Sequence, residues 1–157
     1  MKTFKKLLLL LMLPACTAFT YSEPSIKKEQ AKRVIRKTAM IIMVAHKKVK
    51  DGKVYTGDLA RAIAHQKFAI KLFRAGDYFR AIHHSRRARF FAVEAIKANK
   101  GAEMEEWKLT REEERDVANG PKDEELDKNL LKEMPGEATK DEEIISTKPT
   151  VDLNDNE

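Results

Sequence analysis

The sequence contains a single cysteine, Cys16, so it cannot form an intramolecular disulfide. A zinc site built on several thiolates is excluded for the same reason. The six glycines do not cluster into the glycine-rich loop that cradles a phosphate group. The domain must therefore be stabilised by a packed core.

The sequence also lacks a constellation of residues suited to catalysis. Nucleophilic catalysis needs a hydroxyl or thiol beside an oriented base, and Ser85 next to His84 is a sequence neighbour, not an oriented pair. Carboxylates such as Glu105 and Glu106 lie in acidic runs, where solvent keeps their chemistry ordinary. We predict that the protein is not an enzyme and uses no cofactor. The alternative, a small hydrolase, requires a carboxylate or histidine beside a nucleophile in a pocket.

The start of the chain has the layout of a secretory signal peptide. A lysine-containing leader precedes an unbroken apolar run over residues 7 to 13, which is too short to span a membrane. The following Pro14-Ala15-Cys16 makes the segment resemble the lipobox of bacterial lipoproteins, which implies lipidation of the Cys16 thiol. Cleavage after Ala18 is the alternative. We expect an exported protein, periplasmic or lipid-anchored in a bacterial envelope, with residues 1 to 18 as the signal peptide.

Positive and negative charges are separated along the chain. Residues 23 to 100 hold 20 Lys and Arg against 6 Asp and Glu, whereas residues 101 to 157 hold 8 against 19. The net charge of +6 therefore hides a basic block and an acidic tail. We expect the block to attract polyanions and the tail to compete for the same surface.

The basic block is predicted to form three helices. Apolar residues at helical spacing indicate one helix over 26 to 50. A second begins after Gly57 with Asp58 as its N-cap and ends at Gly76, and a third begins at Asp77 and continues to residue 100. We predict an all-α fold in which residues 26 to 100 form a three-helix bundle.

One face of the first predicted helix is basic. It carries Lys28, Lys32, Arg33, Arg36, Lys37, Lys47 and Lys48. The opposite, apolar face is expected to meet protein, so the basic face is left to meet water or a polyanion.

The second and third predicted helices resemble one tetratricopeptide repeat. The resemblance is carried by Ala69, Leu72, Gly76, Asp77, Tyr78, Ala81 and Ala88. It covers about one repeat length, and no second copy follows at a fixed period. A peptide-binding solenoid is therefore not expected, and the helix over 26 to 50 is predicted to cover the faces that a single repeat leaves open.

Residues 101 to 157 are predicted to form an acidic, partly disordered tail with short helices. Thr110 and Glu113 fit a capping box. A brief apolar stripe follows at Leu126, Leu130 and Met134. Such short helices are marginal in water, so we expect them to order by docking, with Trp107 as the anchor.

The end of the tail, residues 140 to 157, is predicted to be disordered because it is rich in polar and charged residues. Ile144 and Ile145 are its apolar exception. If this stretch attaches to the bundle, we expect it to do so there.

The third predicted helix carries a basic cluster, which is the candidate binding site. Its members are Arg80, His83, His84, Arg86, Arg87 and Arg89. Arginine suits phosphate and carboxylate groups, so the cluster could bind lipid head groups, an envelope polymer or an acidic protein. The alternative is neutralisation by the covalently linked tail. Arg86 and Arg89 fall on the apolar side and need partners, for which the carboxylates of residues 105 to 114 are candidates.

The histidines and aromatic residues have simpler interpretations. The four histidines are not spaced as helical metal ligands, and the adjacent His83 and His84 point about 100° apart on a helix. We predict no metal site. Two pairs, Phe68 with Phe73 and Phe90 with Phe91, could line a ligand pocket together with Met40 and Met43, but we interpret these residues as core packing.

These patterns together predict an interaction or scaffold module whose basic helical face is masked by its own acidic tail. The partner is expected to be a protein. The alternative is binding to a polyanion or an anionic membrane surface. Nucleic acid is the less favoured target, because the leader directs the chain out of the cytoplasm.

Overall fold

The computed structural model describes residues 23 to 136 and 140 to 153. The predicted signal peptide and Cys16 lie outside these described residues. All regular secondary structure in the described ranges is helical, which confirms the predicted all-α class. None of the helices in those ranges has an apolar stretch that could cross a membrane.

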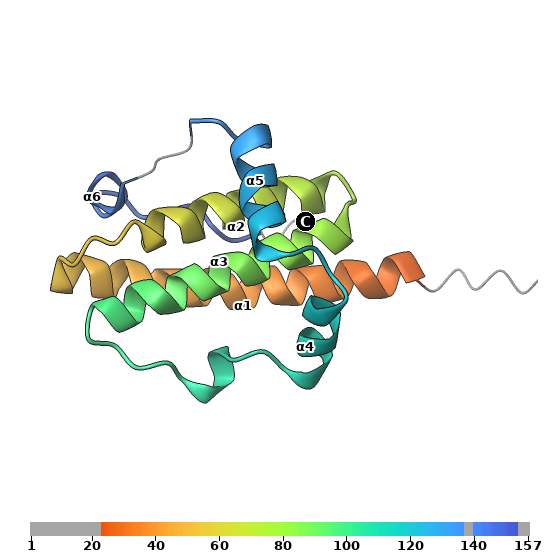
Figure 1. Ribbon diagram of the computed structural model, residues 1–157, viewed down its shortest axis with the longest axis horizontal. Helices are drawn as coiled ribbons and strands as arrows, with labels where there is room; N and C mark the ends of the chain where they lie inside the picture. The colour runs from red at the N-terminus through yellow and green to blue at the C-terminus, as the bar shows by residue number, and fades with distance from the viewer. Residues whose placement is uncertain (1–22, 137–139, 154–157) are drawn as a thin grey trace, which may run out of the picture.

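Three long helices form the centre of the molecule. They are α1 (Glu23–Gly52), α2 (Asp58–Arg74) and α3 (Tyr78–Ala98). In Figure 1, α1 and α3 run in one direction and α2 runs in the other. All three pack against one another, because each has an apolar stripe at helical spacing that must be buried.

The connection between α2 and α3 is a tight turn. Gly76 adopts φ 81°, a left-handed conformation that favours glycine. The side chain of Asp77 then accepts a hydrogen bond of 3.1 Å from the Arg80 amide, as predicted for an N-cap.

The start of α2 differs from the prediction. The N-cap position is Gly57 and not Asp58, which is the first helical residue. The side chain of Asp141, from the tail, accepts hydrogen bonds of 2.9 Å from the amides of both Gly57 and Ala60. A carboxylate distant in sequence therefore does what a local cap would have done.

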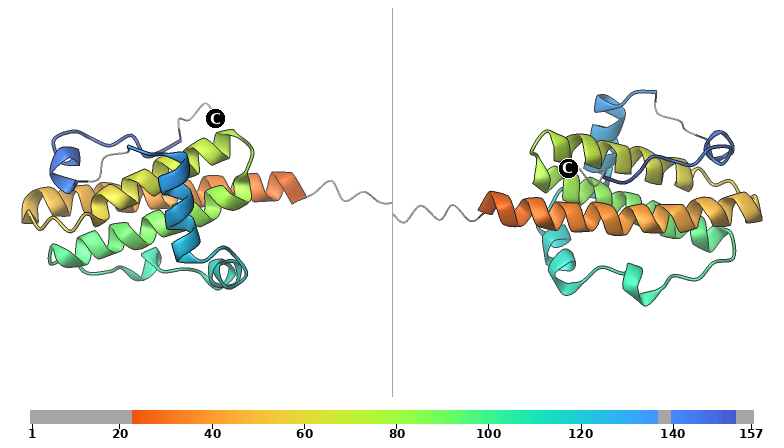
Figure 2. Two further views of the ribbon diagram at one scale, coloured as in Figure 1. Left: turned by 45° about the horizontal axis from the view of Figure 1, so that its top comes forward. Right: turned by 180° about the vertical axis from the view of Figure 1, so that it is seen from behind.

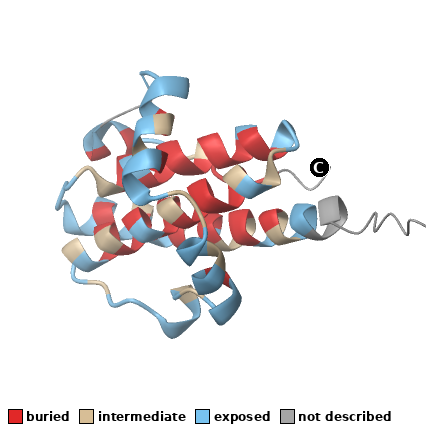
Figure 3. Ribbon diagram, turned by 45° about the vertical axis from the view of Figure 1, so that its right-hand side comes forward, coloured by how far each residue is buried: buried red, intermediate tan, exposed pale blue. Residues whose placement is uncertain are grey.

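The buried core consists of two apolar clusters with a polar layer between them. One cluster contains Ile42, Leu59, Ile63, Phe91 and Ile96, and the other contains Ile35, Phe68, Leu72, Ala81 and Ile82. Thr38, Gln66 and Ser85 lie between the clusters, one on each long helix, and are buried. Figure 3 shows the buried residues gathered along the long helices. The Ser85 hydroxyl donates to Gln66 Oε1 at 2.9 Å, and the Thr38 hydroxyl donates to the Ser85 carbonyl at 3.2 Å. These bonds provide partners for the hydroxyl groups of Thr38 and Ser85 and for the side-chain oxygen of Gln66 within the core.

The described residues that follow α3 lie around the three helices (Figures 1 and 2). They contain the one-turn η1 (Glu105–Trp107), α4 (Arg111–Ala118), α5 (Asp123–Glu133) and α6 (Asp141–Ile144). The capping box of Thr110 and Glu113 is confirmed at the start of α4. Trp107 is partly buried and packs against the first apolar cluster.

The prediction of disorder over 140 to 157 is wrong for residues 140 to 153. Val151 and Leu153 are 3% and 4% exposed and pack into the two apolar clusters. Gln66 Nε2 donates to the Val151 carbonyl at 2.9 Å, which pairs a backbone group of this segment. The prediction was based on the polar composition of this stretch and overlooked two apolar residues. Their burial stabilises the attachment of the stretch to the three long helices. Residues 154 to 157 lie outside the described residues.

Candidate functional site

The arginines of the basic cluster divide between two adjacent faces of α3. Arg80 and Arg87 are seven residues apart and share one face, while Arg86 and Arg89 lie beside it on the buried side. Arg86 and Arg89 are 5% and 3% exposed, which confirms that they fall on the apolar side of the helix. We call Arg80, Arg86, Arg87 and Arg89 the arginine row.

Arg89 is paired with Glu113 of α4 through two hydrogen bonds. Its Nη2 and Nη1 donate to Glu113 Oε1 and Oε2 at 2.8 and 3.3 Å, and the two side chains are 3% and 9% exposed. Oε2 also accepts from the Thr110 amide at 2.9 Å. Burial raises the pKa of Glu113, but Arg89 and the Thr110 amide outweigh it and hold the pKa below its usual value. Glu113 lies within the predicted range of partners, residues 105 to 114.

Arg86 is paired with Asp116, one turn further along α4. Its Nη2 donates to Asp116 Oδ2 at 2.9 Å, and Gln30 of α1 donates to the same oxygen at 2.9 Å. Burial raises the pKa of Asp116, but the hydrogen bond and the charge of Arg86 outweigh this effect and hold the pKa below its usual value. The carboxylate therefore stays ionised. Asp116 therefore joins α4 to both α3 and α1.

The other two arginines are paired with α5. Arg87 Nη2 and Nε donate to the two oxygens of Asp127 at 2.7 and 2.9 Å, and its Nη1 donates to Asp123 at 2.7 Å. Arg80 Nη2 donates to Glu133 at 2.8 Å. No partners were predicted for Arg80 and Arg87, because local sequence does not indicate where α5 crosses α3. The range of residues 105 to 114 was predicted for Arg86 and Arg89, and Asp116, the partner of Arg86, lies outside it.

The two histidines His65 and His84 form a buried pair. Their Nδ1 atoms are 3.1 Å apart, and His65 Nε2 lies 3.1 Å from Asp127 Oδ1. Since the ionised Asp127 can only accept, His65 carries its proton on Nε2, and His84 donates from Nδ1 to His65. Burial lowers the pKa of His65 to about 4 and that of His84 to about 3, so both rings are neutral at pH 7.

His83 points away from this pair. Its ring contacts Phe79 edge to face at 4.5 Å between centroids, and a side chain at Gly120 would collide with it. Burial lowers its pKa to about 4. His83 and His84 were predicted within one cluster, but the structure places them in different surroundings, as the 100° separation on a helix requires.

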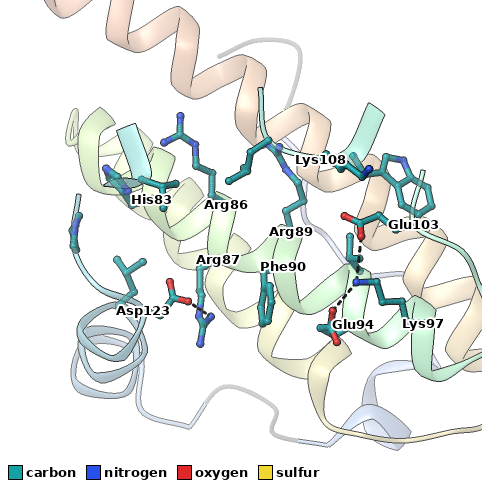
Figure 4. A pocket seen from close by; sticks show the side chains of 16 residues that line it. His83, Arg86, Arg87, Arg89, Phe90, Glu94, Lys97, Glu103, Lys108 and Asp123 are labelled. Atoms are coloured by element: carbon teal, nitrogen blue, oxygen red, sulfur yellow. Dashed lines mark hydrogen bonds and ion pairs between the residues drawn. The ribbon is translucent and has the colours of Figure 1, made fainter. Parts of the chain in front are cut away.

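A cavity of about 370 Å³ lies between α3 and residues 103 to 126 (Figure 4). Arg86, Arg87 and Arg89 line it together with His83. Apolar side chains complete the lining, namely Phe90, Val93, Trp107, Leu109, Val117, Pro121 and Leu126. The interpretation as core packing is wrong for Phe90, which is 51% exposed, and for Met40, whereas Phe68, Phe73 and Phe91 are buried as predicted. The exposure of Phe90 follows from its register, because Phe90 lies beside Phe91, which takes the buried position.

Within the described ranges, no group of three or more His, Cys, Asp or Glu side chains is arranged to hold a metal ion. The arrangement brings guanidinium groups, carboxylates and an apolar cavity together, which suits binding of carboxylates. No family model, curated protein or solved structure matches this chain.

Proposed function

We propose that this chain is a non-enzymatic, exported envelope protein that acts as an interaction or scaffold module. In this proposal, a three-helix bundle with a tetratricopeptide-like hairpin presents the arginine row, and the acidic tail masks it. A protein partner with carboxylates would take the place of α4 on α3. The observation that carries the proposal is the occupation of Arg86 and Arg89 by Asp116 and Glu113.

The tail is held differently at its two helices, which supports displacement of α4 and not of α5. The buried residue of α4 is Glu113, a charged side chain, whereas α5 buries the apolar Leu126 and Leu130. Apolar burial contributes about 1.5 to 3 kcal/mol for each such side chain. The buried contact of α4 itself is therefore made by charge. Residues 103 to 121, which we call the α4 segment, add an apolar contact through Trp107.

Exchange of carboxylates explains how a partner could compete. Removing Glu113 alone would leave Arg89 charged and buried, which costs several kcal/mol. A partner that supplies its own carboxylate avoids this cost, since one ion pair replaces another. The tail has the advantage of being covalently linked, which gives it a high effective concentration. Only a partner with several correctly spaced carboxylates would displace it.

A peptide added in trans tests this proposal. The probe is a fluorescent peptide of residues 108 to 120, and the protein is the full chain with Glu113→Gln and Asp116→Asn. We expect this variant to bind the peptide about ten-fold more tightly than the unaltered chain, because its own α4 no longer competes. Fluorescence anisotropy measures the affinity, and circular dichroism checks that the variant is folded.

A peptide that carries the same two substitutions is the matched control and should bind to neither protein. Equal binding of the acidic peptide to both proteins would contradict masking by the tail. If the double variant is unfolded, displacement can be followed in the unaltered chain through the fluorescence of Trp107, which lies in the α4 segment. No response at saturating peptide then contradicts the proposal.

A second candidate function, binding to an anionic membrane surface, is favoured by a different surface. Met40 is 65% exposed and Val44 37% exposed on α1. Exposed basic residues flank them, and we call the set of Arg33, Met40, Val44, Lys47 and Lys48 the α1 outer face. Apolar side chains between cations are typical of helices that lie in a membrane interface.

Vesicle flotation tests this second candidate. We expect binding to vesicles that contain phosphatidylglycerol, weakening as salt is added, and no binding to phosphatidylcholine alone. Met40→Ser with Val44→Ser should reduce binding to the anionic vesicles without affecting the trans peptide. Binding that is equal on both lipids would contradict a charge-dependent surface.

A further inference from the structure

We propose that the protein partner of the arginine row is a second copy of this chain, and that the two copies exchange their tails. In this dimer, the chain after residue 104 of each copy leaves its own bundle and occupies the other bundle in the same way. The inference rests on the proposed function, because it names the partner that takes the place of α4. Its structural basis is the hinge, by which we mean residues 99 to 104 between α3 and η1.

The end of α3 contains a strained residue. The Lys100 amide donates to the Lys97 carbonyl at 3.1 Å. The Gly101 amide donates to the Ile96 carbonyl at 2.9 Å, which completes a Schellman motif. This motif needs a residue in the left-handed conformation, and here that residue is Lys100, with φ 58°. Residues other than glycine rarely adopt this conformation, so the hinge holds strain that a straight chain would release.

The end of α2 has the same motif without this strain. The Asp77 amide donates to the Leu72 carbonyl at 3.0 Å, and the Gly76 amide donates to the Phe73 carbonyl at 3.0 Å. Glycine therefore occupies the left-handed position, at Gly76. At the end of α3, Gly101 comes one residue too late to fill that position. The two helix ends share one geometry, but only the end of α3 is strained.

The residues of the hinge favour continuation of α3. Ala102, Glu103 and Met104 are strong helix formers, yet residues 101 to 104 have no regular secondary structure. All three are exposed, and the 3.2 Å ion pair of Glu103 with Lys97 joins two partly exposed side chains, which contributes little. In Figure 1 the chain reverses direction at the hinge and runs back along α3. A helix continued through the hinge would direct the tail away from its own bundle.

A second copy carries the correctly spaced carboxylates that displacement of α4 requires. Its tail brings Glu113, Asp116 and Asp127 to the same arginines, together with the apolar Leu126 and Leu130 of α5. Contacts between tail and bundle are then the same as in the single chain, and the assembly closes with two-fold symmetry. The dimer releases the strain of two hinges, whereas the single chain has the higher effective concentration of its own tail. Exchange is therefore favoured by high protein concentration.

A substitution in the hinge should shift this balance towards the dimer. In the single chain, a Cβ at Gly101 would collide with the side chain of Ile96 and lie 2.9 Å from its carbonyl oxygen. In a continuous helix, alanine is favoured over glycine. Both copies gain, so we expect Gly101→Ala to dimerise at least about thirty-fold more tightly than the unaltered chain. Sedimentation equilibrium of the full chain measures this change.

Two further variants sharpen the measurement. Lys100→Gly added to Gly101→Ala should weaken the dimer at least about ten-fold, because glycine suits the left-handed position and disfavours a helix. Gly136→Ala is the matched control and should leave association unchanged, since it lies outside the hinge and its Cβ meets nothing within 4 Å. The proposal is overturned if Gly101→Ala stays monomeric up to about 1 mM protein, or if Gly136→Ala associates equally well.

A cross-link shows whether the dimer is exchanged, and it needs no change in the hinge. Arg33 Nη2 of α1 lies 3.9 Å from Glu112 Oε2 of α4, and both side chains are largely exposed. One full chain carries Arg33→Cys and the other Glu112→Cys, each with Cys16→Ser. The equimolar mixture is refolded from urea at about 1 mM protein and treated with a short bis-maleimide.

Mass spectrometry then distinguishes the mixed dimer from the two like dimers. We expect the mixed dimer in more than its statistical proportion, because exchange places α1 of one copy next to α4 of the other. A statistical mixture, or no cross-linked dimer, would overturn the proposal. This test decides the matter if Gly101→Ala does not fold.

Failure of this inference and failure of the masking function give different results. If the trans peptide binds while Gly101→Ala stays monomeric, the tail can be displaced but a second copy is not the partner. If the mixed dimer forms while the trans peptide does not bind, the tail moves only as a whole. That result contradicts displacement of α4 alone and leaves the exchange of tails standing.

Discussion

The arginine row on α3 and the α1 outer face are both basic, but they differ in how far the tail covers them. On α3, the arginine row is covered by the tail, and each of its members contacts a carboxylate of α4 or α5. On α1, Arg33 lies 3.9 Å from Glu112 of α4, with both side chains largely exposed, whereas Lys47 and Lys48 are exposed and form no ion pair with any residue in the described ranges. The difference shows that charge alone does not bury the tail against a helix. Arginines at the edge of an apolar stripe are buried by α4 and α5, whereas lysines on the outer surface stay in water.

The largest effect is expected at the buried pair of the covered surface. Glu113→Ala should lower the free energy of unfolding by about 3 to 5 kcal/mol, because it leaves Arg89 charged and unpaired. Chemical denaturation measures this loss. The double variant Arg89→Met with Glu113→Leu should regain most of it, and a double variant as unstable as the single one would contradict this explanation.

Acidification should also weaken the covered surface, through His65 and His84. Their pKa values are lowered to about 4 and about 3 in the folded state, so the unfolded chain binds more protons below pH 6.5. Stability should be complete above that pH and fall by about 2 kcal/mol per histidine at pH 5. The charged groups that face the pair are Asp127, Arg87, Arg61 and Arg80, and the titratable His83 also lies nearby.

Denaturation measured from pH 7 to 5 tests this prediction. His65→Gln should flatten the slope, since it removes one titrating ring. A slope unchanged in this variant would mean that other groups carry the pH dependence.

A smaller effect is expected at the start of α2, where the tail supplies the cap. Asp141→Ala should cost about 1 to 2 kcal/mol, because the amides of Gly57 and Ala60 lose their acceptor. Asp58→Ala is the matched control and should cost less, as the Asp58 side chain does not cap the helix. Thermal unfolding of both variants decides between them, and a larger loss for Asp58→Ala would restore the original prediction.

The smallest effect is expected on the exposed surface. Lys47→Gln with Lys48→Gln should change the free energy of unfolding by no more than about 0.5 kcal/mol, because exposed charges far from buried groups contribute little. The same denaturation assay measures it. A loss comparable to that of Glu113→Ala would remove the contrast between the two surfaces.

Local patterns predicted much of the fold. Helical spacing of apolar residues gave the three long helices to within a few residues, and the turn at Gly76 and Asp77 was correct. The capping box of Thr110 and Glu113 was also readable, since both partners lie within one turn. The burial of Arg86 and Arg89 followed from their register on α3.

Contacts between distant segments could not be read in the same way. Asp141 caps a helix 81 residues away along the chain, and Asp127 meets His65 across 62 residues. Nothing in the composition of 140 to 153 distinguishes an attached segment from a disordered one. Two local signals were available. Attachment was expected at Ile144 and Ile145, and both pack against the first apolar cluster. The alternation of Val151 and Leu153 places their side chains on the same side of an extended chain.

The two roles of Glu113 determine how α4 detaches from α3. Its carboxylate completes the first turn of α4 through the Thr110 amide and also holds Arg89, with one oxygen shared between both bonds. Eight residues are too few for α4 to persist as a free helix. Detachment of α4 from α3 and unwinding of α4 are thus a single event. The segment has two states, one helical and bound to α3, and one unfolded and detached.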